Sequence, residues 1–363
     1  MIMIQRQTRI RIAAWLGLMI ICTLLTIVIA KISDSRHTAT TTAQSQTTDV
    51  AKIQSPSSNT SIAASAQLYQ SAHIVSIYLS QQQQITRVPL EQYIAGVVAA
   101  EMPVNFELEA LKAQAMAART YIVRRIVNHD RSGMPVKGAE VTDTVVHQAY
   151  LTDQQLKENW GKKNYQVNIN KIMKVVSETR GLILTYNNQP INATYFSTSN
   201  GYTENSEDYW GVNEPYLRSV ASPWDQKISP SFIKTIQIPY KQFLLKLGLA
   251  NSNSTNKAIP ASLSLNMKST LELSQGQRIA SINIAGKSFT GKDIRERLNL
   301  ASSSFTWKRN GDTMEIQTWG SGHGVGMSQW GANGMAQEGK TASEIVQYYY
   351  KGIVIQSARN LLE

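Results

Sequence analysis

An uncharged apolar run near the N-terminus constrains this 363-residue chain more than any other feature. Residues 13–30 contain no charged side chain, and three arginines precede them. A membrane-spanning helix needs ~17–25 apolar residues, and positive flanks stay on the cytoplasmic side. The sequence therefore predicts a cytoplasmic tail over 1–12, a transmembrane helix over 13–32, and a single-pass cell-membrane protein whose remainder is extracytoplasmic. The alternative is a cleaved signal peptide, which has a shorter apolar region of about 7–15 residues and a small-x-small site.

The composition after this run separates a tether from a folded domain. Residues 33–72 are rich in Ser, Thr and Gln and predict a flexible tether, because they cannot bury enough apolar surface to fold. Residues 73–358 are long enough to bury a core. The single cysteine, Cys22, lies in the apolar run, so the exported part can form neither a disulfide nor a cysteine-ligated zinc site.

The net charge of +11 divides in two. Five basic side chains and one Asp in residues 1–36 account for +4, which leaves +7 on the rest of the chain. That excess suits a polyanionic partner. We do not expect nucleic acid, because the basic domain is predicted to lie on the far side of a membrane.

Helix and strand signals alternate without the regularity of a parallel sheet. A strand is predicted over 74–79, and a helix over 89–101 that stops before a proline. Apolar residues at helical spacing predict a second helix over about 105–128 and a third over about 168–179. Other expected elements are a hairpin from 181–186 to 191–196, strands near 233–238, 268–273, 278–285, 303–308 and 314–319, and a helix after 341. We therefore expect an α+β domain of two lobes around a cleft.

Glu101 is the first candidate for chemistry. It ends an apolar helix just before Met102-Pro103, and its preceding neighbours are small or apolar. Burial raises the pKa of a carboxyl group, which a general acid at neutral pH requires. The alternative is an exposed helix-end glutamate without a catalytic task.

Two cations on the next helix form the second candidate. Lys112 and Arg119 are seven positions apart and therefore lie on nearly the same face. Neighbouring turns carry Gln114 and Tyr121, and a helix that starts so soon after Glu101 must pack beside it. The alternative is that both cations lie on the solvent side.

Residues 319–331 read WGSGHGVGMSQWG and surround His323 with glycines. Such glycines let a backbone approach a ligand closely, with amide groups available to donate. The spacing matches neither the dinucleotide fingerprint nor a P-loop. We interpret the segment, with Ser328 and Gln329, as a functional loop, and the alternative is a structural turn.

Residues 195–204 read YFSTSNGYTE and combine hydroxyl, amide and aromatic groups. Aromatic rings that pack on a ligand and polar groups that fix its orientation suit sugar binding. The segment predicts binding roles for Ser197, Ser199, Tyr202 and Glu204, and the alternative is a polar surface loop.

The histidines do not form a metal motif. His147 and His323 are far apart in sequence, and neither belongs to a His-x-x-x-His or cysteine pair. We therefore expect no metal and no cofactor, and we interpret His147 as an orienting or partly buried polar residue.

Five segments, in this order, resemble the stage II sporulation protein D family. They are VPLEQYIAGVVAAEMP (88–103), EALKAQAMAARTY (109–121), STSNGYTEN (197–205), PYLRSVASPWD (215–225) and GHGVGMSQWGANGMA (322–336). The resemblance spans about residues 74–357. It implies a peptidoglycan lytic transglycosylase that cuts the bond between N-acetylmuramic acid and N-acetylglucosamine and leaves a 1,6-anhydro end. It also implies action on glycan strands already stripped of stem peptides, at the sporulation septum.

The resemblance places the family's catalytic glutamate at Glu101. It implies two partners, a sporulation amidase and a membrane scaffold protein of the engulfment complex. Some relatives bind zinc through a His-Cys pair and a second Cys, but Gln148 follows His147 here, so we expect no such metal. The expected substrate-binding residues are Lys112, Arg119, Tyr121, His147, Ser197, Ser199, Tyr202, Glu204, His323, Ser328 and Gln329.

One carboxylate suffices for this reaction, whereas ordinary glycosidases use two, because the substrate's own C6 hydroxyl is the nucleophile. Stripped strands expose lactyl carboxylates, which Lys112 or Arg119 could hold by charge-assisted hydrogen bonds. Direct contact of Arg119 with Glu101 is not expected, because it would lower the pKa of the glutamate. Two rival hypotheses are a non-catalytic peptidoglycan-binding enhancer of an N-acetylmuramoyl-L-alanine amidase and a metal-dependent hydrolase.

Overall fold

The computed structural model describes residues 73–250 and 271–362, which form a mixed α+β structure. Their buried apolar side chains fall into two groups. The large cluster takes its members from 75–217 and 325–358, and the small cluster takes its members from 238–316.

A three-stranded sheet opens the described chain. β1 (Ile74–Leu79) pairs antiparallel with β2 (Gln84–Pro89) and parallel with β3 (Val141–Thr142). Alternate residues of β1 are buried, as the period of a strand requires. The sheet therefore supplies one apolar face to the large cluster.

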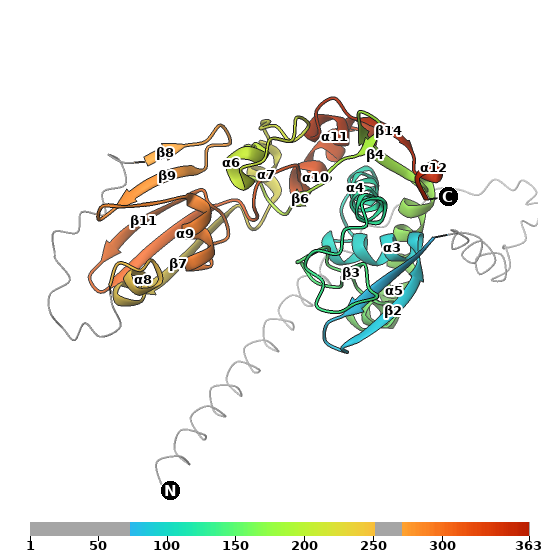
Figure 1. Cartoon of the computed structure of the whole chain (residues 1–363), viewed down its shortest axis with the longest axis horizontal. Helices are drawn as coiled ribbons and strands as arrows, with labels where there is room; N and C mark the ends of the chain where they lie inside the picture. The colour runs from blue at the N-terminus through green and yellow to red at the C-terminus, as the bar shows by residue number, and fades with distance from the viewer. Residues whose placement is uncertain (1–72, 251–270, 363) are drawn as a thin grey trace, which may run out of the picture. The chain divides into compact units, whose positions relative to one another are not determined.

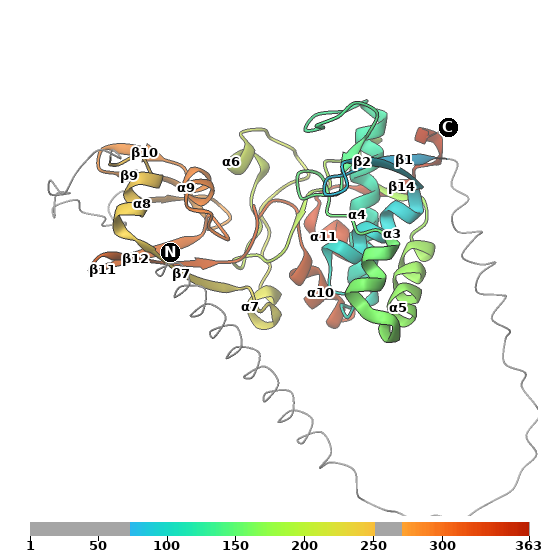
Figure 2. The same ribbon diagram turned by 90° about the horizontal axis from the view of Figure 1, so that it is seen from below.

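The helix α4 (Leu108–Val127) lies at the centre of the large cluster. It contacts α3 (Leu90–Glu101), α5 (Asp153–Glu178) and β4 (Leu182–Tyr186), and Figures 1 and 2 show it surrounded by these elements. Its buried alanines let neighbouring elements approach closely.

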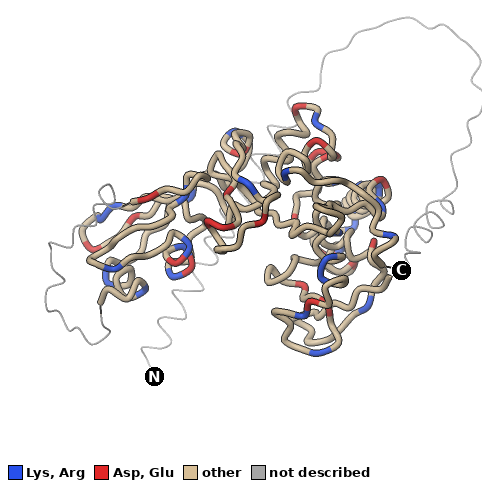
Figure 3. The backbone as a smooth tube through the Cα atoms, turned by 45° about the horizontal axis from the view of Figure 1, so that its top comes forward, with Lys and Arg blue, Asp and Glu red and all other residues tan. Residues whose placement is uncertain are grey.

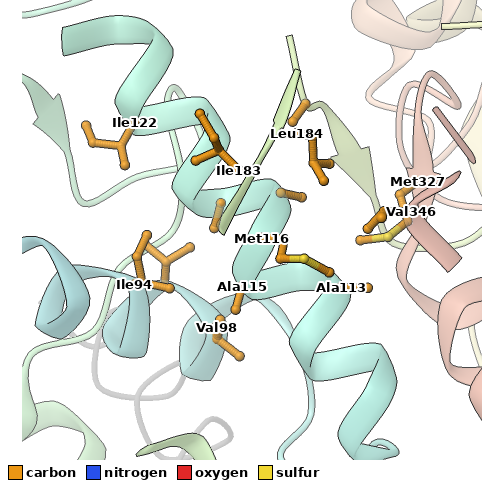
Figure 4. Packing of buried hydrophobic residues seen from close by; sticks show 14 of the residues in the cluster. Ile94, Val98, Ala113, Ala115, Met116, Ile122, Ile183, Leu184, Met327 and Val346 are labelled. Carbon is orange, nitrogen blue, oxygen red and sulfur yellow. The ribbon is translucent and has the colours of Figure 1, made fainter. Parts of the chain in front are cut away.

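Figure 4 shows this packing from both sides of α4. Ile94 and Val98 of α3 lie on one side, and Ile183 and Leu184 of β4 lie on the other. All four side chains are fully buried. The end of α3 is thereby fixed against α4.

The C-terminal part of the chain returns to the large cluster. β4 is the central strand of a sheet with β5 (Gln189–Pro190) and β14 (Val354–Ser357), and β6 (Tyr195–Phe196) pairs with β13 (Met327–Ser328). The helices of this part are α6 (Ser206–Trp210), α7 (Trp224–Ile228), α10 (Gln329–Gln337), α11 (Ala342–Tyr349) and α12 (Arg359–Leu362).

The small cluster lies among two antiparallel sheets and two helices. One sheet has the order β11-β12-β7 and the other β10-β9-β8. The elements are β7 (Ile233–Pro239), α8 (Tyr240–Lys246), β8 (Leu271–Leu273), β9 (Ile279–Ile284), β10 (Lys287–Phe289), α9 (Gly291–Leu298), β11 (Phe305–Asn310) and β12 (Thr313–Trp319). In Figure 3, short basic and acidic segments are scattered over the described chain.

The local predictions of secondary structure are largely confirmed. β1, α3, β11 and β12 lie close to the expected positions, and α11 begins after Thr341, which caps it in a capping box. The α+β character of the fold class is confirmed, and the cleft between two lobes stays a prediction.

Two elements differ from expectation. α5 begins fifteen residues before the predicted 168, at Asp153, because its first half is too polar to show an apolar face and Gly161 interrupts it. The predicted strand 191–196 does not complete a hairpin with β4, because only Gln189–Pro190 pairs there and β6 pairs with β13 instead.

The expected membrane helix needs correction. Within residues 73–250 and 271–362 no helix is both long and apolar enough to cross a bilayer. The span predicted over 13–32, with the tail over 1–12 and the tether over 33–72, lies outside the described residues. The transmembrane part of the fold class and the single-pass localisation are therefore withdrawn.

Candidate functional site

Glu101 is the last residue of α3, and hydrogen-bond donors surround its carboxylate. The proline after Met102 favours extended backbone there (φ −127°, ψ 142°), so the helix ends at Glu101. The N–H of Ala149 donates to Oε1 at 2.8 Å, and Nε2 of Gln329 donates to Oε2 at 3.4 Å. The Tyr195 hydroxyl also hydrogen-bonds the carboxylate.

Two opposing effects set the pKa of the Glu101 carboxyl. Burial raises the pKa above its ordinary value, whereas the hydrogen bonds from Ala149, Gln329 and Tyr195 lower it. The net direction is upward, as a general acid requires. The donors stabilise the ionised form, so the same group can serve as a base.

A short parallel strand pair brings Tyr195 and Gln329 together. Met327 of β13 lies opposite Tyr195 of β6, and α10 begins directly after β13 with Gln329. Ser328 caps α10 by accepting from the N–H of Gly331 at 3.2 Å. The predicted glycine-rich loop therefore does deliver one residue, Gln329, to Glu101.

The glycines themselves approach other parts of the chain. Gly326 has φ +82°, and a Cβ there would lie 2.1 Å from the carbonyl oxygen of Thr194. Gly324 has φ +90°, and a Cβ there would lie 2.3 Å from Nε of Arg278. The close approach that we expected toward a ligand is an approach to the protein's own backbone and side chains.

The face of α4 toward this site carries two polar residues. Gln114 is fully buried, and its Oε1 lies 3.5 Å from Nε2 of Gln329. Within the described residues its own Nε2 has no hydrogen-bond partner. Tyr121, seven positions on, is half-buried with the guanidinium of Arg125 5.9 Å from its ring centre, and burial raises its pKa.

The two cations predicted to bind substrate have partners within the protein. Arg119 is fully buried and forms an ion pair with Glu91 at 2.6 Å. Lys112 bridges Glu109 at 2.7 Å and Glu178 at 2.5 Å. Arg119 does not contact Glu101, as expected, but its burial gives it a packing role rather than access to a ligand.

His147 fixes the loop that precedes Ala149. Its Nδ1 accepts from the backbone N–H of Thr142 at 3.2 Å, and its Nε2 lies 3.0 Å from the carbonyl oxygen of Ser132. Burial lowers its pKa. Because both ring nitrogens and the amide of Gln148 are engaged, these residues do not fit a zinc ion.

Three predicted serines belong to a buried polar network around Asp225, one through its hydroxyl and two through backbone groups. The Oγ of Ser328 donates to Asp225 at 2.5 Å, and the backbone N–H of Ser199 donates to it at 2.8 Å. Ser197 contributes its carbonyl oxygen, which accepts from the N–H of Trp330 at 3.1 Å. The network fixes the start of α10. These serines therefore position Gln329 indirectly, without touching Glu101.

The remaining predicted residues have partners other than Glu101. Glu204 is buried with its Oε2 3.9 Å from Nε of Arg278, and burial raises its pKa. His323 packs among Phe196, Tyr209 and Trp210, and burial lowers its pKa to about 3. Tyr202 is 44% exposed.

Glu204 also lines a cavity of about 370 Å³ with Arg278 and Tyr209. Glu101 is not among the residues that line this cavity. The structure thus brings Gln329 to Glu101, pairs Glu204 with Arg278, and packs His323 against Phe196, with a hydrogen bond to the Tyr195 backbone. Among the described residues no group of three or more His, Cys, Asp and Glu side chains could hold a metal ion.

Comparison with known proteins agrees with the resemblance. A family model described as Stage II sporulation protein matches residues 78–186. Stage II sporulation protein D of Bacillus subtilis (strain 168) is 49% identical over 284 residues, which cover 78% of this chain and 79% of that protein. The chain belongs to the stage II sporulation protein D family.

Other relatives extend the comparison. Stage II sporulation protein D of Bacillus amyloliquefaciens is 47% identical over 290 residues, with 79% of this chain and 80% of that protein covered. A protein named Amidase enhancer from Bacillus subtilis (strain 168) is 30% identical over 308 residues, with 73% of this chain but 40% of that protein covered.

Sequence reasoning missed several residues of the site in this member of the stage II sporulation protein D family. Tyr93 and Gln148 join Tyr195 in a hydrogen-bonded line, and Asp225 anchors the serine network. Only Tyr93 and Asp225 lie within the segments that resemble the family, and that location is the one sequence signal that could have marked them. Nothing local marked Gln148, whose partners are 47 and 55 positions away.

Proposed function

We propose that this sporulation protein is a lytic transglycosylase that cleaves peptide-stripped peptidoglycan glycan strands during septum remodelling and engulfment. The observation that carries the proposal is Glu101, a half-buried carboxyl group with a raised pKa and donors on both oxygens. A single carboxyl group in this state can act as acid and then as base.

In the proposed reaction, Glu101 first donates its proton to the glycosidic oxygen between N-acetylmuramic acid and N-acetylglucosamine as the C1–O bond breaks. The resulting carboxylate then removes the proton from the C6 hydroxyl of the muramic acid as that oxygen bonds to C1. The products are a 1,6-anhydro end and a free N-acetylglucosamine hydroxyl. Glu101 regains its proton, so no second carboxylate and no external water are consumed.

The proposed partners follow from the same substrate. Strands without stem peptides require an amidase that removes the peptides first, and a membrane scaffold protein of the engulfment complex would hold the two activities together. We no longer assign Arg119 to the lactyl carboxylate, because its guanidinium is fully buried against Glu91.

The test is Glu101→Gln in the purified full chain, incubated with peptide-stripped glycan strands. Mass spectrometry should detect 1,6-anhydro ends with the wild type and none with the variant. Glu107→Gln is the matched control, because Glu107 lies near the end of α3 but is exposed. Equal anhydro product from Glu101→Gln and the wild type would refute the assignment.

A second candidate function is enhancement of an N-acetylmuramoyl-L-alanine amidase without catalysis. The 30% identity to the protein named Amidase enhancer favours it. The two candidates separate in one assay, in which the chain is added to a sporulation amidase and intact peptidoglycan. An enhancer would accelerate peptide release equally well as wild type or Glu101→Gln, without any anhydro product.

A further inference from the structure

Three polar side chains form a hydrogen-bonded line that ends on Glu101. The Tyr93 hydroxyl donates to Oε1 of Gln148 at 2.9 Å, and Nε2 of Gln148 donates to the Tyr195 hydroxyl at 3.0 Å. Tyr195 in turn hydrogen-bonds the Glu101 carboxylate. Tyr93 is 0% exposed and Gln148 is 1% exposed, so water does not compete for these bonds.

The hydrogen bonds of this line all donate in a defined direction. A tyrosine hydroxyl carries one proton, and an amide has a separate donor and acceptor. Because Gln148 gives an N–H to the oxygen of Tyr195, the Tyr195 proton remains available for Glu101. If the amide of Gln148 turned over, its oxygen would compete with Glu101 for that same proton.

We propose that Gln148 and Tyr93 are positioning residues for Glu101, which act through Tyr195 by directing its hydroxyl proton onto the carboxylate. Gln148 is well placed for this, because the backbone N–H of the next residue, Ala149, donates to Oε1 of the same carboxylate at 2.8 Å. One dipeptide therefore reaches the carboxylate twice, directly through Ala149 and through Tyr195 for Gln148. Buried hydrogen bonds in such a chain polarise one another, so the far hydroxyl of Tyr93 influences Glu101 without touching it.

The surroundings of the line are mostly uncharged. Burial raises the pKa of Tyr93, the nearby Tyr121, Glu101 and Tyr150 raise it further, and the guanidinium of Arg125 lowers it. Burial raises the pKa of Tyr195, and the charge of Glu101 raises it further, with small contributions from Tyr93 and Tyr121. On the side of α10, Gln329 is the group that reaches Glu101.

The inference rests on the proposed function for its role in turnover, but its direct test does not need activity. The full-length chain is labelled with carboxyl-¹³C glutamate, and Glu101→Gln identifies the Glu101 signal. The pH midpoint of that signal is then compared among the wild type, Tyr93→Phe, Tyr195→Phe and the double variant. Tyr349→Phe is the control, because Tyr349 is equally buried but bonds Ser222 instead.

Loss of a donor destabilises the ionised carboxylate, so Tyr93→Phe and Tyr195→Phe should both move the Glu101 midpoint upward. The double variant should shift by less than the sum of the two single shifts, because Tyr93 acts on Glu101 chiefly through Tyr195. Three results would each overturn the proposal: an unchanged midpoint in Tyr93→Phe, additive shifts in the double variant, or an equal shift in Tyr349→Phe.

The line and the lytic function can fail separately. If the midpoints shift as expected while Glu101→Gln still forms anhydro ends, the positioning role stands and the catalytic assignment is wrong. If Glu101→Gln is inactive but Tyr93→Phe has an unshifted midpoint, the positioning role is wrong. In active protein, the alkaline limb of the pH–rate profile should move with the midpoint in Tyr93→Phe.

Discussion

The Nε2 of Gln329 lies 3.4 Å from Oε2 of Glu101, although 228 positions separate the two residues in the chain. Gln329 begins α10 and Glu101 ends α3, so the contact joins two helix termini. The serine network around Asp225 fixes the first of these termini, and the proline after Met102 fixes the second.

Replacement of Gln329 by Leu should impair catalysis without unfolding the protein. The variant loses a donor to the ionised carboxylate, so the pKa of Glu101 should rise and proton donation to the glycosidic oxygen, the step that creates this carboxylate, should slow. A hydrogen bond to a charged group supports a loss of about tenfold in kcat. Release of anhydro ends measures the rate, and Gln337→Leu at the exposed other end of α10 is the control. Equal rates for the two variants would contradict a role for Gln329.

Replacement of Arg119 by Gln should destabilise the fold. The change leaves Glu91 buried without its guanidinium partner, and breaking a buried ion pair in this way costs about 3–5 kcal/mol. The free energy of unfolding in urea measures the loss. Arg131→Gln is the control, because its ion pair with Glu140 is half-exposed and should contribute about 1 kcal/mol or less. Similar losses in the two variants would remove the special role of the buried pair.

Replacement of Lys112 by Gln should leave substrate choice unchanged. Both oxygens that its ammonium group contacts belong to the protein, from Glu109 and Glu178. The ratio of anhydro ends formed from stripped and from peptide-bearing strands should therefore match the wild type. A lowered preference for stripped strands would restore the earlier hypothesis that Lys112 binds the lactyl carboxylate.

The sequence was informative wherever the cause is local. The end of α3 at Glu101 follows from the next two residues, and the cap of α11 follows from Thr341 and Glu344. The partner of Arg119 could not be predicted in this way, because Glu91 lies on another helix and their contact depends on how α3 packs against α4. A basic residue on a polar helix looks the same in sequence whether it faces solvent or a buried carboxylate.

The glycines near His323 were correctly predicted to allow a close approach, but the structure gives a different partner for that approach. The glycines near His323 predicted close approach, and close approach does occur, but to Thr194 and Arg278. Which surface a glycine faces depends on long-range strand pairing, here β6 with β13. Spacing alone carries no information about that pairing.

Replacement of Gly326 by Ala should be more damaging than the same change at Gly211. Both glycines have positive φ, +82° and +75°, so both substitutions carry backbone strain. At Gly326 the new Cβ would also lie 2.1 Å from the carbonyl oxygen of Thr194, whereas at Gly211 nothing lies within 4 Å. Thermal unfolding should show a larger fall in Tm for Gly326→Ala, and equal falls would mean that β6 moves freely to make room.

Replacement of Glu101 by Gln should alter how stability depends on pH. Burial raises the folded-state pKa of Glu101 above its unfolded value, so the folded state binds this proton more tightly. The stabilisation is fully present below the unfolded pKa, about 4.3, and is lost as pH rises through the folded-state pKa. Glutamine does not titrate, so Glu101→Gln should gain stability relative to the wild type across that window.

Glu344→Gln should show the opposite trend, because hydrogen bonds from Thr341 lower the pKa of Glu344 to about 2, and the wild type loses that stabilisation as pH falls. Urea unfolding from acid to neutral pH measures both differences, and a constant difference for Glu101→Gln would mean that burial does not perturb the carboxyl group.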